Sequence, residues 1–238
     1  MKNNIHSMIL AMAACISGQC LALTPITEEF ESAKIDPVNW FYYHDTKSKL
    51  VQTNGVLNFR VLSKPLAGNY SSIELLTSQP SFNENWEMTL DITNMSSYVR
   101  TVGGGITIFN SVDRNDRLYI SYYGKAGIGV GADTNKVNAH FSKLSPGVAT
   151  ATGGVRVSFS RKTKLLTIFL SDNMSGEGYQ WRKIGSFSPN GVGGDARANW
   201  KLDPVSGGFG IQLFGNAVTR AISSGKITFD NFVLAGRP

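Results

Sequence analysis

Apolar and polar residues alternate with a period of two along most of the chain that follows its N-terminal segment. One parity of the segment 86–93 (WEMTLDIT) carries only apolar residues, namely Trp86, Met88, Leu90 and Ile92. Because successive side chains of a β-strand point to opposite faces, this pattern is typical of strands with one buried face. No stretch has the sustained spacing of an amphipathic helix. The alternation therefore predicts an all-β protein.

Clusters of Gly, Asn, Asp, Ser and Pro divide the alternation into about a dozen short strands. Three pairs of strands read as hairpins, at 50–61 around Asn54-Gly55, at 102–123 around the polar turn 111–116, and at 155–170 around a basic turn. Further strands are expected at 72–77, 136–143, 180–187, 209–214 and 225–236. The order of strands and turns favours one antiparallel β-sandwich of two sheets.

The last expected strand, Gly225–Gly236, changes parity partway along. Ile227 and Phe229 share one parity, and Phe232 and Leu234 share the other. An extra residue is needed for both pairs to face one core, and Asp230-Asn231 lies at the switch. We therefore expect a β-bulge there, and pairing of this strand with an early strand, so that both ends of the chain meet.

The first 22 residues read as a secretory signal peptide. Lys2 supplies a positive charge, Met8–Ile16 an apolar stretch too short to span a bilayer, and Ala22 a suitable cleavage position. Lipidation at Cys20 is the alternative, and Gln19 disfavours it because a small residue is expected there. The sequence thus predicts a secreted or periplasmic protein with one domain, residues 23–238.

Cleavage after Ala22 would leave 238 − 22 = 216 residues with no cysteine, because Cys15 and Cys20 both lie in the leader. Such a chain is stabilised by its core rather than by disulfides. With only His44 and His140 remaining, zinc hydrolysis and Cys–His catalysis are poorly provided for. A Gly-x-Ser-x-Gly nucleophile motif is also absent from the sequence.

The processed chain would carry 23 − 1 = 22 basic residues, since Lys2 is removed, against 17 acidic ones. The densest basic cluster is the expected hairpin turn Arg161–Lys164. It reads either as a solvated turn that discourages edge-to-edge aggregation or as an attraction to acidic glycans or anionic surfaces. No motif supports nucleic acid as a partner.

The order of the segments resembles the concanavalin A-like lectin and glucanase superfamily of jelly rolls. The resemblance rests on FESAKIDPVNW, VQTNGVLNF, GGGITIFNSVDRNDRLYISYYG, VRVSFSRKTKLLTIFLSDN and FGIQLFG followed by GKITFDNFVL. It implies two stacked, curved antiparallel sheets, with glycans held on a concave face or by rim loops. The superfamily contains enzymes, lectins and non-catalytic modules, so fold alone does not decide function.

The catalytic motifs of the enzymes in this superfamily are missing from the sequence. Laminarinase-like members carry Glu-x-Asp-x-x-Glu, which places two carboxylates on one face of a strand. Here Glu87 and Asp91 lack the third member, and they take the parity opposite to the apolar residues, so both are expected to face solvent. The Gln-x-His strand of alginate-lyase-like members is absent as well.

Two oxygen-rich places are candidate calcium sites, since calcium prefers oxygen ligands. The turn residues Asp113, Asn115 and Asp116 form one, although tight turns use the same residues for local hydrogen bonds. The resemblance implies the other, in which Asp230 on the last strand pairs with Glu29 or Glu31.

Aromatic side chains are the usual platforms for sugar rings. By position, the candidates are Tyr43, Tyr98, Tyr122, Tyr179 and Trp200, whereas Trp40, Trp86 and Trp181 are expected in the core. The sequence therefore favours a secreted, non-catalytic protein that binds a polysaccharide or other glycan, neutral or acidic. The alternatives are a polysaccharide hydrolase or lyase with an atypical site and a structural or adhesive envelope protein.

Overall fold

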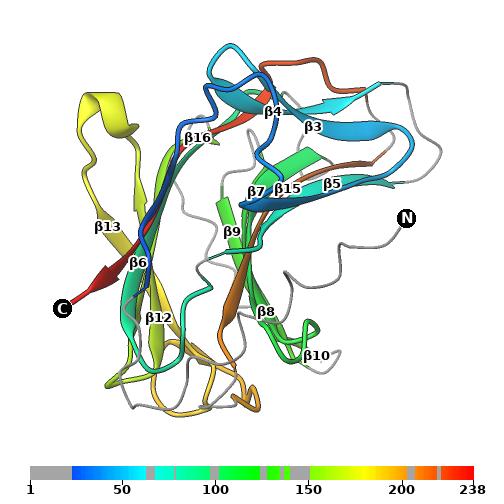
Figure 1. Ribbon diagram of the computed structural model, residues 1–238. Coiled ribbons are helices and arrows are strands. Elements are labelled where there is room, and N and C mark those ends of the chain that lie inside the picture. The colour runs from blue at the N-terminus through cyan, green and yellow to red at the C-terminus, as the bar shows by residue number, and fades with distance from the viewer. Residues whose placement is uncertain are drawn as a thin grey trace, which may run out of the picture.

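The computed structural model describes residues 23–62, 68–77, 79–96, 102–123, 128–134, 137–139, 151–202, 207–218 and 221–238. Strands dominate these ranges and form two layers that face each other across a common core (Figure 1). All strand pairs are antiparallel except the short pair formed by β13 and β14. The predicted two-sheet antiparallel sandwich is confirmed.

The first layer is a nine-stranded sheet with the order β14-β13-β12-β11-β6-β16-β4-β3, in which β1 also pairs with β16. Its strands are β1 (Ile26–Glu28), β3 (Ser48–Thr53), β4 (Val56–Val61), β6 (Asn85–Asn94), β11 (Ala151–Ser160), β12 (Leu165–Ser171), β13 (Arg182–Ser188), β14 (Ala196–Arg197) and β16 (Ile227–Arg237).

The second layer is a seven-stranded sheet with the order β10-β9-β8-β7-β15-β5-β2. Its strands are β2 (Trp40–His44), β5 (Gly68–Leu75), β7 (Val102–Asn110), β8 (Arg117–Tyr122), β9 (Ile128–Thr134), β10 (Val137–Ala139) and β15 (Phe209–Val218). The three predicted hairpins are the pairs β3–β4, β7–β8 and β11–β12.

The β3–β4 hairpin turns where the sequence predicts it. Asn54 and Gly55 both have positive φ, at 56° and 72°, as a type I′ turn requires. Asn and Gly are the residues that adopt this conformation at least cost, so the dipeptide sets the register in which Leu50 faces Phe59.

The core lies between the two sheets and is filled by the apolar parity of their strands. Trp86, Met88, Leu90 and Ile92 on β6 are all fully buried, as the alternation predicts. Near one end an aromatic cluster closes the sandwich, with ring centroids of Phe159 and Phe209 4.8 Å apart. The expectation that Trp181 belongs to this core is wrong, because its partly buried ring lies over Gly154 and Arg156 on the outer face of the nine-stranded sheet.

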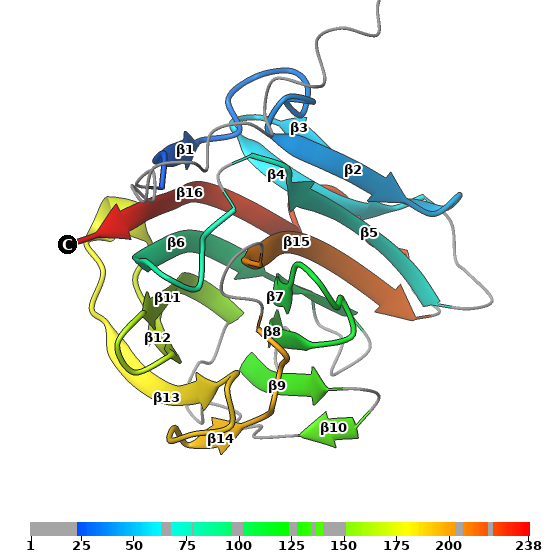
Figure 2. The same ribbon diagram turned by 60° about the horizontal axis from the view of Figure 1, so that its bottom comes forward.

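The parity change in the last strand is a β-bulge. The pairing of β16 with β6 shifts register between Asp230 and Val233, and Asn231 has a positive φ of 51°. The bulge turns both Phe229 and Phe232 into the core, where each is fully buried. Beyond it, β16 pairs with β1, so the first and last described strands lie side by side (Figure 2).

The helical element among the described residues is the single turn η2 (Ser175–Glu177). Within the described ranges, no helix is long and apolar enough to cross a membrane.

Candidate functional site

The outer face of the seven-stranded sheet gathers tyrosine, amide and hydroxyl side chains. On β8, Leu118, Ile120 and Tyr122 point into the core and are buried. Strict alternation therefore places Tyr119 and Ser121 on the other side, away from the core. We call this side of the seven-stranded sheet the outer face.

Glycines on neighbouring strands make room for the tyrosine rings of the outer face. A methyl group added at Gly131 would lie 2.3 Å from the hydroxyl oxygen of Tyr119. One added at Gly103 would lie 3.2 Å from the ring of Tyr123. The first contact would force the ring of Tyr119 to shift and the second would be tight, so glycine lets these rings lie close over β9 and β7. The glycines thus shape the floor of a site.

The resulting hollow has a volume of about 440 Å³. Its lining is contributed by β5, β7, β8, β9 and β15 and the residue after β8, and consists of Tyr70, Thr107, Arg117, Tyr119, Ser121, Tyr123, Asp133, Phe214 and Asn216. Hollows of this size accommodate small ligands or one part of a longer chain.

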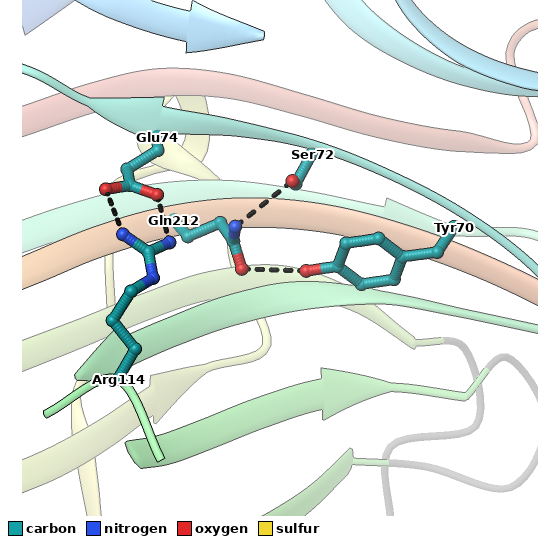
Figure 3. Close-up of polar contacts among 5 residues, drawn as sticks. All are labelled: Tyr70, Ser72, Glu74, Arg114 and Gln212. Atoms are coloured by element: carbon teal, nitrogen blue, oxygen red, sulfur yellow. Dashed lines mark hydrogen bonds and ion pairs between the residues drawn. The ribbon is translucent and has the colours of Figure 1, made fainter. Parts of the chain in front are cut away.

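A chain of hydrogen bonds fixes the polar groups beside the hollow (Figure 3). The hydroxyl of Tyr70 donates to Oε1 of Gln212 at 2.7 Å, and Nε2 of Gln212 donates to Oγ of Ser72 at 3.1 Å. Burial raises the pKa of Tyr70, so the phenol stays protonated and keeps its role as a donor. The amide of Gln212 is thereby held in one orientation.

Each carboxylate placed at the outer face is paired with an arginine. Arg114 binds Glu74 through both terminal nitrogens, with Nη1 2.8 Å from Oε1 (Figure 3). Nε of Arg117 lies 2.8 Å from Oδ2 of Asp133. Glu74 and Asp133 therefore each have an arginine as partner at the outer face.

A row of aromatic rings runs across the strands at one side of the hollow. The ring centroids of Tyr43 and Tyr70 are 6.1 Å apart, and those of Tyr70 and Phe214 are 5.9 Å apart with planes inclined by only 17°. Tyr43, a predicted stacking residue, is 51% exposed on the edge strand β2. It is thus the predicted aromatic residue that lies beside the hollow.

Burial overturns two other predicted stacking residues. Tyr122 is fully buried between the sheets, because it shares the parity of Leu118 and Ile120. Trp200 is 1% exposed and packs against Phe187, with ring centroids 5.2 Å apart. Neither ring is available to a sugar. Tyr98 lies outside the described residues, as do His140 and the predicted signal peptide.

Tyr179 lies on the opposite side of the molecule, over the outer face of the nine-stranded sheet. Its ring packs beside Trp181 with centroids 4.3 Å apart, and a methyl group added at Gly154 would lie 2.4 Å from it. Burial raises the pKa of the Tyr179 phenol, and the charge of Asp91, whose carboxylate accepts a hydrogen bond from it, raises that pKa further. Tyr179 therefore anchors the segment that follows β12 to the sheet.

The expectation that Asp91 faces solvent is wrong, whereas its parity is as predicted. Asp91 is 1% exposed because the segment after β12 covers it. Its carboxylate accepts hydrogen bonds from the amide and hydroxyl of Ser175, the latter at 2.6 Å, and from Nδ2 of Asn231 at 2.9 Å. Glu87 lies four residues earlier on the same face of β6, where it pairs with Arg237 and is 3.6 Å from Arg156. Both carboxylates thus have structural partners.

Neither predicted calcium site brings three acidic side chains together. Oδ1 of Asp113 accepts hydrogen bonds from the backbone and side-chain nitrogens of Asn115, both at 3.0 Å, and Asp116 is 2% exposed in the same turn. Asp113 thus uses Oδ1 for hydrogen bonds within the turn. Across the described part of the chain, no group of three or more His, Cys, Asp or Glu side chains could hold a metal ion.

Asp230 is close enough to Glu29, Glu31 and Asp91 to feel their charges, but it does not form a metal site with them. Burial is the main factor that raises the pKa of Asp230, and repulsion from the three neighbouring carboxylates adds to it. Its Oδ1 accepts the backbone N–H of Asn231 at 2.8 Å, which belongs to the bulge. Glu31 instead lies over the β3–β4 turn, near Gly55.

The sequence prediction missed Tyr70, Tyr119, Tyr123 and Phe214, which line the hollow, and Gln212, which is hydrogen-bonded to Tyr70 beside it. A signal for Tyr119 and Tyr123 is present in Arg117–Tyr123, because Leu118 and Ile120 assign the inward parity to Tyr122. Counting parity from these aliphatic residues would have placed the two flanking tyrosines outside.

Comparison with solved structures identifies the fold as the concanavalin A-like jelly roll. Lectin II from Ulex europaeus superposes with a TM-score of 0.59 at 10% identity, covering 91% of this chain and all of the lectin. An endo-1,3-β-glucanase from Streptomyces sioyaensis gives 0.57 at 11% identity, covering 89% and 96%. The Ca²⁺/Man2-bound exoplasmic/lumenal domain of VIP36 gives 0.50 at 14% identity, covering 90% and 87%. No protein-family model and no curated protein sequence matches the chain.

Proposed function

We propose that this protein is an exported, non-catalytic carbohydrate-binding protein, and that its ligand lies on the outer face of the seven-stranded sheet. The observation that carries the proposal is the hollow floored by glycines and lined by Tyr70, Tyr119 and Tyr123. Tyrosine rings stack on the apolar faces of sugars while their hydroxyl groups bind sugar hydroxyls. Fold neighbours described as lectins support this proposal, and the glucanase neighbour keeps catalysis as its alternative.

The polar groups of the site suit a ligand rich in hydroxyl groups. Gln212 and Thr107 offer neutral donors and acceptors at or beside the hollow, and the buried Ser72 accepts a hydrogen bond from Gln212. The network through Tyr70 holds these groups in place before ligand binds, which reduces the entropy lost on binding. Such neutral, preorganised hydrogen-bonding groups favour a glycan over an apolar molecule.

The non-catalytic part of the proposal is supported by the pairing of Glu74 and Asp133 with arginines. A hydrolase built on this face would need to free both carboxylates from their partners. We therefore expect no release of reducing ends from laminarin or other β-glucans, and no unsaturated uronates from alginate. Sustained turnover that Glu74→Gln abolishes would establish the enzyme alternative.

Binding is tested by glycan-array screening followed by isothermal titration calorimetry with the polysaccharide that gives the strongest signal. We expect Tyr119→Ala to weaken binding by about tenfold or more, because truncating an aromatic anchor of a binding site costs roughly 1–2 kcal/mol or more. Trp181→Ala, a half-exposed ring on the opposite sheet, is the matched control and should leave affinity unchanged. Absence of binding to every glycan would refute the proposed function.

The proposal that the protein is exported rests on the leader-like segment ahead of Leu23. Expression of the full chain in a bacterial host, followed by cell fractionation, tests it. We expect the protein in the periplasm or the medium, at a mass lower than that of the full chain. A protein retained in the cytoplasm at full mass would contradict export without affecting the binding experiment.

A further inference from the structure

The backbone nitrogen of Leu23 is bound by a carboxylate. It lies 3.0 Å from Oε2 of Glu84, and Oε1 of the same carboxylate accepts the backbone N–H of Ser81 at 2.7 Å. Glu84 is partly buried, and each of its two oxygens is directed at one specific donor. A carboxylate held in this way binds a positively charged nitrogen more strongly than a peptide N–H.

Leu23 itself is fixed in the fold. Its side chain is 7% exposed and belongs to the core, and its backbone passes within 3.9 Å of the position that a methyl group on Gly236 would occupy. Three residues later β1 begins, and Ile26 pairs with Leu234 of β16. The position of the Leu23 nitrogen is therefore set by the docking of β1 on β16.

Leu23 also borders a hollow of about 440 Å³. This hollow is lined by Leu23, Pro25, Asn83, Glu84, Asn85, Arg161, Gly236, Arg237 and Pro238. It has room for water, which could accept the additional N–H groups that an ammonium carries and a peptide nitrogen does not.

We propose that Glu84 is the receptor for a new N-terminus created by cleavage between Ala22 and Leu23. In that step, water adds across the peptide bond; the carboxylate forms on Ala22 and leaves with the leader, and the amine forms on Leu23 and takes up a proton. A signal-peptidase-type hydrolase supplies the catalysis. The amide-to-carboxylate hydrogen bond thereby becomes an ion pair. The inference rests on the proposed export and is independent of glycan binding.

The order of events follows from burial. Because Leu23 is a core residue, a protease cannot reach the bond before it in the folded protein. Cleavage precedes folding, and folding then docks the ammonium onto Glu84. Removal of the leader thus stabilises the mature fold, because it creates the ammonium group that Glu84 binds.

The ion pair predicts a specific pH dependence. The charged side chains that line the hollow are Glu84, Arg161 and Arg237, and Arg237 pairs with Glu87. An α-amino group is the kind of group that changes charge between roughly pH 7 and 10, so the amine of Leu23 carries the pH dependence of this contact. An adjacent carboxylate raises the pKa of this amine above the ~7.7–8.0 of an unperturbed one. Its stabilising effect is therefore complete below about pH 7.7 and is lost as the pH rises through the raised pKa.

The first experiment determines the N-terminus of the full chain after export by a bacterial host, using intact-mass spectrometry. We expect Leu23 as the first residue. A mature chain that begins at any other residue would overturn the inference, and the binding measurements on that same protein would still decide the proposed function.

The second experiment compares the melting temperatures of two chains released from a fusion by a protease that leaves no extra residue. One begins at Leu23 and the other at Leu21, and each is made with and without Glu84→Gln. At pH 6.5 we expect the chain that begins at Leu23 to melt about 2–4 °C higher, and this advantage to vanish near pH 10. We also expect Glu84→Gln to remove the advantage at every pH.

The longer chain is the control for the bond between Glu84 and Ser81. Both chains contain this bond, and Glu84→Gln changes it equally in both. Equal melting temperatures of the two chains, or an advantage that survives Glu84→Gln, would refute the ion pair. An advantage that does not change with pH would refute it as well.

Discussion

Tyr70 connects the aromatic and polar parts of the outer face. Its ring stacks on Phe214, while its hydroxyl donates to Gln212. It is also near enough to Arg114 and Arg117 that their charges lower its pKa, although burial, which raises it, is the larger effect. A change at this residue should therefore affect binding through both stacking and hydrogen bonding, and the two contributions can be separated.

Tyr70→Phe keeps the ring and removes the hydroxyl. We expect glycan affinity to fall by about threefold to tenfold, because Gln212 loses the donor that orients it and one hydrogen bond contributes ~1 kcal/mol. Tyr42→Phe is the matched control, since the hydroxyl of Tyr42 accepts the backbone N–H of Leu50 away from the site. Calorimetric titration of both variants tests this, and equal losses in affinity would contradict a specific role for Tyr70.

Gly131→Ala tests whether glycine shapes the site. The new methyl group would lie 2.3 Å from the hydroxyl oxygen of Tyr119, so that ring must move off β9. We expect a loss of affinity as large as that of Tyr119→Ala and a loss of stability of about 1–3 kcal/mol. In Gly176→Ala, the matched control, the methyl group meets nothing within 4 Å. Denaturation and titration of both variants decide, and retained affinity in Gly131→Ala would refute the glycine floor.

Among the elements, β16 carries the feature on which closure of the sandwich depends. Its bulge turns Phe229 and Phe232 to the same core, and Asn231 supports it through a positive φ and a bond to Asp91. Asn tolerates this conformation better than most residues, which explains why the sequence places it there.

Two substitutions separate the conformational role of Asn231 from its hydrogen bond. Asn231→Ala loses both and should destabilise the protein by about 2–4 kcal/mol, whereas Asn231→Gly keeps the conformation and should cost ~1–2 kcal/mol. Urea denaturation measures both variants. If the two cost the same, the positive φ contributes nothing, and the whole effect belongs to the bond with Asp91.

The raised pKa of Asp230 predicts that replacing this residue stabilises the protein, in contrast to the substitutions of Asn231. Its folded pKa exceeds its unfolded value, so the folded state binds more protons, and stability decreases as the pH rises through that interval. Asp230→Asn should therefore raise the melting temperature at pH 7, and the gain should disappear in acid, where the carboxyl of the parent protein is protonated. A calcium site at Asp230 would give the reverse, namely a loss that depends on calcium and is abolished by a chelator.

At the scale of strands and turns, the sequence predicts most of what the structure contains. Alternation and Asn54-Gly55 predicted the strands and the first hairpin, and the parity change predicted the bulge in β16. These features are local, because period and turn chemistry act over a few residues. Contacts such as Arg114 with Glu74, which are 40 residues apart, depend on how the strands order into sheets, and no local pattern reports that order.

The same limit explains the errors about single aromatic residues. Tyr122 was misplaced although its own strand carries the correct parity, and Trp200 lies in a region without regular alternation. Asp91 was expected to face solvent because parity distinguishes the two sides of a strand but not whether another segment covers the outer side. Burial by the segment after β12 is a tertiary effect and required the structure.

In the whole molecule, the two outer faces differ in chemistry. The segment containing Ser175 and Tyr179 covers part of the nine-stranded sheet and satisfies its polar groups, so that face serves mainly to hold the fold together. The seven-stranded sheet carries the hollow, and its charged groups are paired across the strands. This asymmetry is the reason to assign the proposed binding function to the seven-stranded sheet.

The pairing of charges at the outer face predicts that the preferred ligand is a neutral glycan, although the chain as a whole is basic. Arg114 and Arg117 are each neutralised by a carboxylate, so an anionic sugar would have to break these ion pairs or bind beside them. We expect affinity for a neutral polysaccharide to change by less than about twofold when NaCl rises from ~0.1 M to ~1 M, which shortens the Debye length from ~10 Å to ~3 Å. Titration of one neutral and one uronate-rich polysaccharide at both salt concentrations measures this. Tighter binding of the uronate polymer, lost at high salt, would show that the arginines rather than the tyrosines select the ligand.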